Sequence, residues 1–417
     1  MIRSKMLKMN KNEQIPEFIG EDSIVPHFQP IIQTSTRNII GYEVLGRQFV
    51  PPNEYKSLGP KFHNPKENIV ENINIDRIIR EKAVKQLKES GSNTQLFFNM
   101  MPNQLSVIHT EDFMNPERFH IIQLAEKYGI NKKNIVIEIT EEEFQGEIEK
   151  LIRLVNVFRN YGFKIAIDDM GVGSSSLERI GYIHPDIIKV DIKIMRESLN
   201  KASFRQVLNA ISKMSIKLGS DLLFEGVETE EELILALSMG ANLLQGFYFS
   251  KATKEFQVTS HFSKNLKTIL EKFSGLRFLE IAQDFQRQQE IVDKLSNILK
   301  DIEKKEGDEL FRYVSEVLRT FPTDISHVFF CDLHGYQITP TYERKENSEW
   351  KEIISDIGNN FAWKPYFAQH KAEVYHFNKK WGVTEPLYDL QTRKQYVIFT
   401  FSITESVILI AKVILDT

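Results

Sequence analysis

Short apolar runs rich in β-branched residues alternate with longer helical patterns between about residues 25 and 250. Eight runs predict strands, at Pro26–Gln33, Ile39–Gly46, Gln95–Met100, Ile135–Thr140, Lys164–Asp168, Ile187–Asp191, Leu222–Glu225 and Asn242–Gly246. Strands that alternate with helices are typical of βα units and a parallel sheet. Eight such units in about 230 residues favour a (β/α)8 barrel over an open doubly wound sheet. No glycine-rich dinucleotide loop follows an early strand, which also argues against the open sheet.

The pattern changes between about residues 252 and 320, where apolar residues recur at spacings of three, four and seven. They are Ile281, Phe285, Val292, Leu295, Leu299 and Ile302. This spacing predicts an amphipathic helical connector. Its apolar face either packs on the same chain or forms a dimer seam, and the pattern leaves both interpretations open.

Strand patterns return from about residue 325. They predict strands at His327–Asp332, Tyr336–Thr341, Gln395–Phe401 and Val407–Asp416, with a helix near Trp350–Ile357. Hairpins crossed by a helix indicate a small α+β domain. We therefore predict four parts: an N-terminal extension (1–21), the barrel (22–252), the connector (253–310) and the α+β domain (311–417).

Composition narrows the functional classes. The 417 residues include 53 Lys and Arg against 57 Asp and Glu, so the net charge of −4 excludes a global basic field for nucleic acid or anionic lipid. Cys331 is the only cysteine, which excludes an intramolecular disulfide and favours the cytosol. The N-terminus lacks the pattern of a secretory signal, and no apolar run approaches the roughly 20 residues that span a bilayer. We expect a cytoplasmic protein with no membrane span and no DNA-binding element.

Charged and amide side chains stand at or just beyond the C-terminal ends of seven predicted strands. They are Glu43, Asn99, Glu138 with Glu141 beyond it, Asp168 with Asp169, Lys189 with Asp191, Glu225 with Glu228, and Gln245. Active sites of (β/α)8 barrels lie at that rim, so we expect these groups to converge on one cavity. Carboxylates brought together raise one another's pKa unless cations neutralise them.

The donor types select the cation. Carboxylates and an amide oxygen, without clustered His or Cys, suit Mg²⁺ or Mn²⁺ rather than zinc or copper. The adjacent Asp168 and Asp169 allow one carboxylate to bridge two ions, and ions about 3.5–4 Å apart are the standard device for phosphodiester hydrolysis. Lys189 can then hold the attacking water and Arg47 a phosphate oxygen. Alternatively, the Lys189 and Arg47 side chains only form ion pairs with the surrounding carboxylates.

These residues lie in motifs that resemble the EAL domain, the family of cyclic di-GMP phosphodiesterases. Tyr42-Glu43-Val44-Leu45-Gly46-Arg47 is similar to the motif that names the family, with Val44 in place of Ala. The other matching segments follow in the family's order: Phe28-Gln29-Pro30-Ile31, the Asn99 strand, Glu138-Ile139-Thr140-Glu141, Asp168-Asp169-Met170-Gly171, Lys189-Val190-Asp191, Glu225-Gly226-Val227-Glu228 and Gln245-Gly246-Phe247. The resemblance covers about residues 22–250. It implies a TIM-type barrel whose first strand runs antiparallel to the others.

The resemblance also implies a role for each residue. One Mg²⁺ would be held by Glu43, Asn99, Glu138 and Asp168, and a second ion or its waters by Asp168, Asp169 and Glu225. Glu225 would be the general base, Lys189 would orient the nucleophilic water, and Glu141 would anchor the loop that follows Asp168-Asp169. The dinucleotide would contact Gln29, Arg47, Asp191, Glu228 and Gln245. The reaction would open one phosphodiester of cyclic di-GMP to give linear pGpG, with Mn²⁺ as a substitute metal and Ca²⁺ as an inhibitor.

The chain departs from the family pattern in the loop after Asp168-Asp169. Met170 replaces Phe, Val172 replaces Thr or Ala, and Ser174 stands at an aromatic position; the usual proline is also missing from Phe249–Thr253. These changes favour an alternative, a receptor that binds cyclic di-GMP with little or no turnover. A third interpretation is a barrel hydrolase that acts on another phosphodiester.

The C-terminal segment resembles the YkuI-type regulatory domain, a PAS/Cache-like sensor fold. The similarity lies in the segments 330–338 and 362–367. Trp363, Tyr366 and Phe367 would line a ligand pocket, or else form the core of a small domain. The resemblance implies that an unidentified small molecule regulates the phosphodiesterase. We also expect a homodimer.

Overall fold

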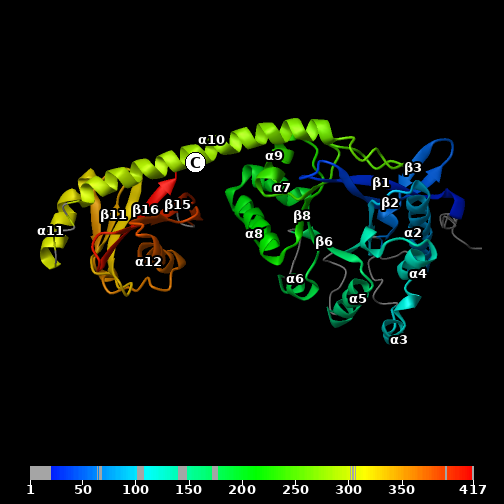
Figure 1. The fold of residues 1–417 in the computed structure, drawn as a ribbon, viewed down its shortest axis with the longest axis horizontal. Helices are drawn as coiled ribbons and strands as arrows, with labels where there is room; N and C mark the ends of the chain where they lie inside the picture. The colour runs from blue at the N-terminus through cyan, green and yellow to red at the C-terminus, as the bar shows by residue number, and fades with distance from the viewer. Residues whose placement is uncertain are drawn as a thin grey trace, which may run out of the picture. The chain divides into compact units, whose positions relative to one another are not determined.

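The computed structural model describes residues 20–62, 64, 68–100, 108–139, 148–170, 177–300, 302, 305, 307–389 and 392–415. It divides into two compact units, Met1–Gly275 and Leu276–Thr417 (Figure 1). The finer division into four parts remains a prediction. Glu141, Val172 and Ser174 lie outside the described residues, as does most of the N-terminal extension.

The strands of the first unit form a nine-stranded sheet that closes on itself. They are β1 (Ile24–Gln33), β2 (Ile39–Val50), β3 (Glu54–Ser57), β4 (Gln95–Asn99), β5 (Ile135–Ile139), β6 (Lys164–Met170), β7 (Ile187–Val190), β8 (Asp221–Phe224) and β9 (Leu243–Leu244). Their order is β1-β9-β8-β7-β6-β5-β4-β2-β3, and an additional pairing of β1 with β2 closes the barrel. β1 runs antiparallel to both neighbours, whereas the pairings from β2 through β4 to β9 are parallel. The predicted barrel with an antiparallel first strand is therefore confirmed, while the hairpin strand β3 was not predicted.

Helices follow the barrel strands. They are α1 (Gly59–Phe62), α2 (Ile69–Ser90), α3 (Thr110–Met114), α4 (His120–Lys127), α5 (Ile148–Asn160), α6 (Leu177–Ile183), α7 (Ile192–Asn200), α8 (Ala202–Leu218) and α9 (Glu230–Ser238). In α5 the buried residues Leu151, Leu154, Val155 and Phe158 recur at the spacing of one helix face. α9 begins with a capping box, in which Thr229 and Glu232 satisfy each other's backbone N–H groups.

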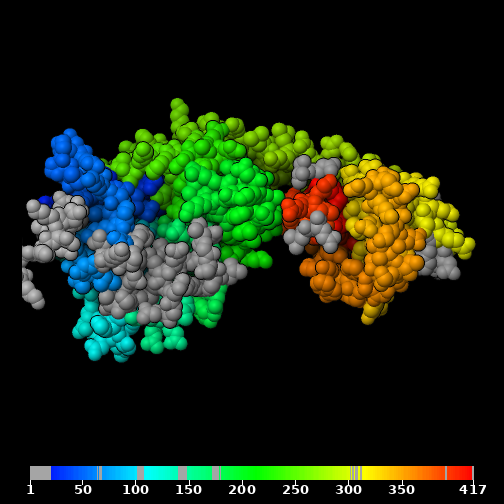
Figure 2. Space-filling view, turned by 180° about the vertical axis from the view of Figure 1, so that it is seen from behind, coloured from blue at the N-terminus to red at the C-terminus, as the bar shows by residue number. Residues whose placement is uncertain are grey.

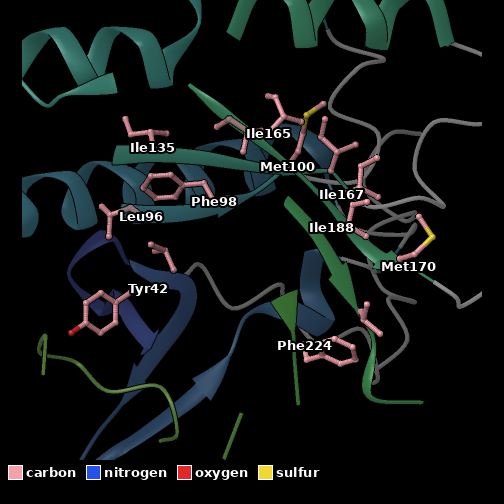
Figure 3. Close-up of a cluster of buried hydrophobic side chains, with 14 of the residues drawn as sticks. Tyr42, Leu96, Phe98, Met100, Ile135, Ile165, Ile167, Met170, Ile188 and Phe224 are labelled. Carbon is pink, nitrogen blue, oxygen red and sulfur yellow. The ribbon is translucent and has the colours of Figure 1, made fainter. Parts of the chain in front are cut away.

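Alternate residues of the barrel strands belong to two separate apolar clusters. The outer cluster includes residues such as Tyr42, Phe98 and Ile165, from β2, β4 and β6 (Figure 3). The apolar faces of the helices belong to the same cluster. The inner cluster takes one residue from each of seven strands: Ile31, Phe97, Val136, Ala166, Ile187, Leu223 and Leu243. Because side chains alternate along a strand, the inner cluster is the apolar layer that fills the barrel.

The eighth barrel strand, β2, contributes a glycine to this layer. A Cβ atom on Gly41 would lie 2.7 Å from Cε2 of Phe97, closer than real contacts allow. The missing side chain therefore makes room for the Phe97 ring in the barrel interior.

The second unit is an antiparallel α+β domain. Its strands are β10 (Ile325–Asp332), β11 (Thr341–Arg344), β12 (Trp350–Ile353), β13 (Trp381–Val383), β14 (Leu387–Tyr388), β15 (Gln395–Ser402) and β16 (Val407–Leu415), in the order β12-β11-β10-β16-β15-β13, with β14 paired to β15. Its helices are α11 (Gly307–Val317) and α12 (Pro365–Phe377). One sheet face packs against residues of α10 (Ser263–Leu299) and α11, and the other packs against Phe367 of α12. Figure 2 shows the red atoms of the last strands next to the orange atoms of α12.

One prediction for this unit is wrong and another is confirmed only in part. The segment near Trp350–Ile357 has apolar residues at helical spacing, but Trp350–Ile353 pairs with β11 as a strand and only Ile354–Asp356 form a short 3-10 helix. Strand pairing overrides the local pattern there, and Ile354 and Ile357 remain exposed. Only isolated bridges form at Tyr336 and Gln337, and the strand begins at Thr341, after Pro340, which has no N–H to donate.

The connector forms the helix α10, and its apolar stripe has two parts. Val292, Leu295, Leu299 and the following Ile302 are buried in the core of the second unit, as expected of a helix packed on its own chain. Phe285 remains 64% exposed and Ile281 39% exposed. Among the described residues, no helix is both long enough and apolar enough to cross a membrane.

Candidate active site

A polar layer lies directly above the apolar layer in the barrel. Two residues beyond each inner apolar position, toward the C-terminal ends of the parallel strands, the sequence places Glu43, Asn99, Glu138, Asp168, Lys189, Glu225 and Gln245. On the antiparallel β1 the corresponding residue is Gln29, two positions before Ile31. The period of two that points apolar side chains into the barrel therefore brings these polar side chains to one end of its interior.

Lys189 lies among three carboxylates. Its Nζ is 3.0 Å from Glu138 Oε1, 3.0 Å from Asp168 Oδ2 and 3.1 Å from Glu225 Oε2. The Lys189 and Glu138 side chains are 1% and 0% exposed, so these ion pairs are shielded from water. A buried ammonium with three hydrogens matches three carboxylate partners.

Glu43 holds together a second group of side chains. Its Oε1 accepts a hydrogen bond of 2.9 Å from Asn99 Nδ2, and its Oε2 accepts one of 2.6 Å from Gln245 Nε2. Gln29 is the register partner of Glu43 across the β1–β2 pair. A Cβ atom on Gly246 would lie 2.0 Å from the carbonyl oxygen of Val227, so only glycine allows the tight turn that follows Gln245.

An irregularity in β6 presents Asp168 and Asp169 together. The register between β6 and β7 shifts between Ile167 and Met170. Asp169 takes a left-handed φ of 57°, and its N–H donates to Asp168 Oδ1 at 2.9 Å. Bulges of this kind redirect side chains beside functional sites. One oxygen each from Asp168, Asp169 and Glu225 lie within 4.8 Å of one another.

The electrostatics of the site are dominated by burial. Burial raises the pKa of Glu138 and of Glu225 well above the usual range, and Lys189 opposes both shifts. Burial lowers the pKa of Lys189, but the carboxylates of Asp168, Glu138 and Glu225 outweigh it and raise that pKa well above its usual range. Burial and the neighbouring Asp168 raise the pKa of Asp169. The cluster therefore gains from any further cation.

These donors fit divalent cations that prefer oxygen ligands. Asp168, Asp169 and Glu225 form a compact oxygen cluster, and Glu138 Oε2 is buried without a hydrogen-bond partner among the described residues. Carboxylate oxygens with an adjacent amide oxygen suit Mg²⁺, Mn²⁺ or Ca²⁺. The structure thus provides an acidic cluster suited to metal binding.

Comparison with known proteins identifies this barrel. A profile of the EAL domain matches residues 12–252, and a profile of the EAL-domain associated signalling protein domain matches residues 257–414. The chain belongs to the EAL-domain family. The EAL-domain containing protein YkuI of Bacillus subtilis (strain 168), itself uncharacterized, is 30% identical over 396 residues, which cover 93% of each chain.

Solved structures and a phosphodiesterase agree with this assignment. The crystal structure of B. subtilis YkuI with its substrate c-di-GMP and calcium has a TM-score of 0.86 and 26% identity, covering 95% of this chain and 98% of that one. A standalone EAL protein from Vibrio cholerae O395 in a c-di-GMP-bound form has a TM-score of 0.50 and 28% identity, covering 58% of this chain and 97% of that one. The cyclic di-GMP phosphodiesterase RocR of Pseudomonas aeruginosa is 25% identical over 240 residues, covering 55% of this chain and 57% of RocR.

The remaining predicted residues of the EAL domain surround the cluster or lie apart from it. Gln29 Nε2 donates to the Ser250 carbonyl at 3.4 Å, and Arg47 donates to the Gly46 carbonyl at 2.9 Å. Asp191 caps α7, where its Oδ1 accepts from Lys193 N at 2.5 Å. Glu228 is not in the acidic cluster, because its half-exposed side chain pairs with Arg196 at 2.8 Å.

One group that supports the EAL site from α2 was not predicted from the sequence. Arg80 Nη2 donates to the main-chain carbonyl of Asn99 at 2.9 Å, and Arg80 Nε lies 2.7 Å from Asp76 Oδ2. Arg80 is only 6% exposed. The available signal was an i,i+4 acid–base pair next to Ile75 and Ile79, on the face of α2 that faces the strands.

Proposed function

We propose that the chain is a Mg²⁺-dependent phosphodiesterase that hydrolyses cyclic di-GMP to linear pGpG. The observation that carries the proposal is the polar layer itself, in which Lys189 contacts Glu138, Asp168 and Glu225 at 3.0, 3.0 and 3.1 Å. The similarity to YkuI, whose crystal structure contains c-di-GMP, and to the phosphodiesterase RocR supports the same substrate.

In this proposal the chain provides ligands for two ions. Glu43, Asn99, Glu138 and Asp168 would hold one Mg²⁺, and Asp168, Asp169 and Glu225 would hold the second. The bound ions would supply Lewis-acid stabilisation of the charge that develops on the phosphate and the leaving oxygen. Mn²⁺ would substitute for Mg²⁺, whereas the larger Ca²⁺ would support binding and slow the reaction because its coordination is less strictly octahedral.

The chain's own residues would move the proton. Water would attack one phosphorus, the bond from that phosphorus to the 3′ oxygen would break, and the 3′ oxygen would take up a proton from solvent. Glu225 would accept the proton of the water, and burial, which raises the pKa of Glu225, favours the protonated carboxyl that results. Lys189 would orient the water, while Gln29, Arg47, Asp191, Glu228 and Gln245 would bind the dinucleotide.

A receptor that binds cyclic di-GMP without turnover is the second candidate. Lys189 already neutralises part of the carboxylate charge, so the cluster is partly balanced without a metal. Met170, however, is only 4% exposed and packs in the outer apolar cluster. Its replacement of the usual Phe is therefore a packing change at the end of β6, on the side away from the ligands, which favours the enzyme.

The second unit and α10 suggest how such an enzyme would be assembled and controlled. We infer a cytoplasmic homodimer regulated through the C-terminal domain. Phe278, Ile281 and Phe285 follow one face of α10 and are 71%, 39% and 64% exposed. This apolar stripe would pack against a second copy of the chain. Sedimentation of the wild type and of Phe285→Glu tests this point, and an unchanged dimer would exclude this stripe.

The test of the activity is a chromatographic assay for pGpG after incubation with cyclic di-GMP and Mg²⁺. Glu225→Gln serves as the matched variant, because it keeps the side-chain shape and removes the base. Product from the wild type alone supports the enzyme. Binding of cyclic di-GMP without product from either protein supports the receptor. Equal hydrolysis of cyclic di-AMP would mean that the site selects a broader class of phosphodiesters.

A further inference from the structure

The second unit contains a cavity on the sheet face that α12 partly covers. Its volume is about 760 Å³, within the range of small-molecule sites. Residues from β10, β15 and β16 form its floor, and α12 and the segment 383–387 contribute its walls. The predicted aromatic group divides here: Tyr366 lines the cavity, Phe367 is part of the core and Trp363 is 72% exposed.

The floor of the cavity changes from apolar to polar in the same direction on two neighbouring strands. On β16 the step is from Ile410 to Lys412, and on β10 it is from Phe329 to His327. Phe329 pairs with Ile410 and His327 pairs with Lys412, so each row spans both strands. The cavity thus has an apolar end and a polar end.

Aromatic rings form much of the apolar surface. The rings of Phe329 and Phe361 lie with their centroids 4.6 Å apart, and Tyr366 and Tyr396 also line the cavity. Flat aromatic ligands pack well against such walls.

The polar end is rich in hydrogen-bond donors. Lys412 Nζ forms an ion pair with Asp389 and lies 4.4 Å from the centroid of the Tyr396 ring. The lining residues include two lysines, Lys364 and Lys412, and one carboxylate, Glu385. The Lys412 ammonium thus lies on a central strand at the polar end of the cavity, with its side chain only 19% exposed and Asp389 as its ion-pair partner.

We infer that this cavity binds a small aromatic molecule that carries an acidic group. The ring packs against Phe329 and Phe361, and the anion binds the Lys412 ammonium in competition with Asp389. The site is assigned from the second unit alone and does not depend on the reaction catalysed in the barrel.

Two fluorescent probes of similar size test this chemistry on the full-length protein. The anionic probe is 8-anilino-1-naphthalenesulfonate, and the neutral one is N-phenyl-1-naphthylamine. All three tryptophans, Trp350, Trp363 and Trp381, belong to the second unit, so energy transfer from tryptophan favours a probe bound there.

The variants separate the contribution of the Lys412 charge to probe binding from that of the aromatic wall. Lys412→Met should weaken the anionic probe about tenfold and leave the neutral probe within about twofold, because one charged hydrogen bond is lost. Lys351→Met, an exposed lysine on β12, should change neither affinity. Phe361→Ala should weaken both probes. Asp389→Asn should tighten the anionic probe and leave the neutral probe within about twofold, whereas partial unfolding, which exposes apolar surface, would raise the binding of both probes.

Three results would overturn the inference. The first is anionic-probe binding that does not saturate. The second is an affinity for the anionic probe that is equal in Lys412→Met and the wild type. The third is an equal loss of anionic-probe affinity in Lys412→Met and Lys351→Met. If Lys412→Met does not fold, the affinity of Asp389→Asn for the anionic probe becomes the test of the site. An unchanged or weaker affinity in that variant rejects the site.

Discussion

Gln245 Nε2 donates a 2.6 Å hydrogen bond to Glu43 Oε2, although 202 residues separate them in the chain. The bond joins the end of β9 to β2 across the antiparallel β1, which lies between them in the closed barrel. Glu43 also accepts a hydrogen bond from Asn99 on β4. One carboxylate on β2 thus orders two polar side chains, one at the end of β4 and one directly after β9.

Glu43→Gln should therefore separate catalysis from folding. We expect pGpG formation to fall about 100-fold or more, because the proposed metal site would lose a charged ligand, and losses of supporting groups alone already cost 10- to 100-fold. The fold should persist because Gln245 Oε1, buried without a described hydrogen-bond partner, can accept from the new amide. Turnover and thermal unfolding are measured together, with the exposed Glu54→Gln as control. A large drop in Tm would show that Glu43 is mainly structural.

Lys189→Met should destabilise the barrel, and Mg²⁺ should reverse part of the loss. Removing one partner of a buried ion pair costs about 3–5 kcal/mol, since the remaining charges are uncompensated. A divalent cation would restore positive charge near Glu138, Asp168 and Glu225. Calorimetry with and without Mg²⁺ measures the effect, with the exposed Lys217→Met as the matched variant. A Tm equal to that of the wild type in both conditions would contradict the ion-pair account.

Arg80 is predicted to be a positioning residue for Asn99. Arg80→Lys keeps the charge but loses the forked geometry that contacts both Asp76 and the Asn99 carbonyl. We expect about tenfold lower turnover and a higher Mg²⁺ concentration for half-maximal activity. The neighbouring exposed Arg77→Lys should behave as the wild type. An unchanged Mg²⁺ dependence in Arg80→Lys would restrict Arg80 to a role in stability.

His370 should make the second unit sensitive to acid. Burial lowers its pKa to about 4, while Glu373 opposes this shift and Lys379 adds to it. The unfolded histidine, with a pKa near 6.5, binds a proton more readily, so stability should fall as the pH drops from 6.5 toward 4. The loss at pH 5 should be about 1–2 kcal/mol.

Unfolding followed by tryptophan fluorescence measures this effect, because all three tryptophans lie in the second unit. His370→Gln should lose less stability between pH 7 and pH 5 than the wild type does. An equal loss of unfolding free energy between pH 7 and pH 5 in both proteins would assign the acid sensitivity to other groups.

The barrel could be predicted from the sequence because, along each strand, the two-residue alternation of side chains leads from an inward apolar residue to an inward polar residue at the end of the strand. Apolar Phe97, Val136 and Ala166 precede the polar Asn99, Glu138 and Asp168 by two residues. The same spacing that fills the barrel also places the site, so local patterns were sufficient for both. The antiparallel β1 came only from the family resemblance, since apolar periodicity does not report strand direction.

Elsewhere tertiary contacts decide the structure. The helical spacing of Trp350, Ile353 and Ile357 was misleading because pairing with β11 is a long-range property. The i,i+4 spacing from Asp76 marks Arg80 in the sequence, but its contact with a main-chain carbonyl on another element is a tertiary property. The cavity beside Lys412 likewise depends on how far α12 covers the sheet.

The most direct test of the central claim is a metal exchange on the bound nucleotide. The protein is first saturated with cyclic di-GMP in Ca²⁺, then excess Mg²⁺ is added, and the bound nucleotide is analysed by chromatography over time. We predict that cyclic di-GMP persists in Ca²⁺ and is converted to pGpG after Mg²⁺ is added. Cyclic di-GMP that stays bound and intact in Mg²⁺ would contradict the proposed phosphodiesterase and leave a receptor.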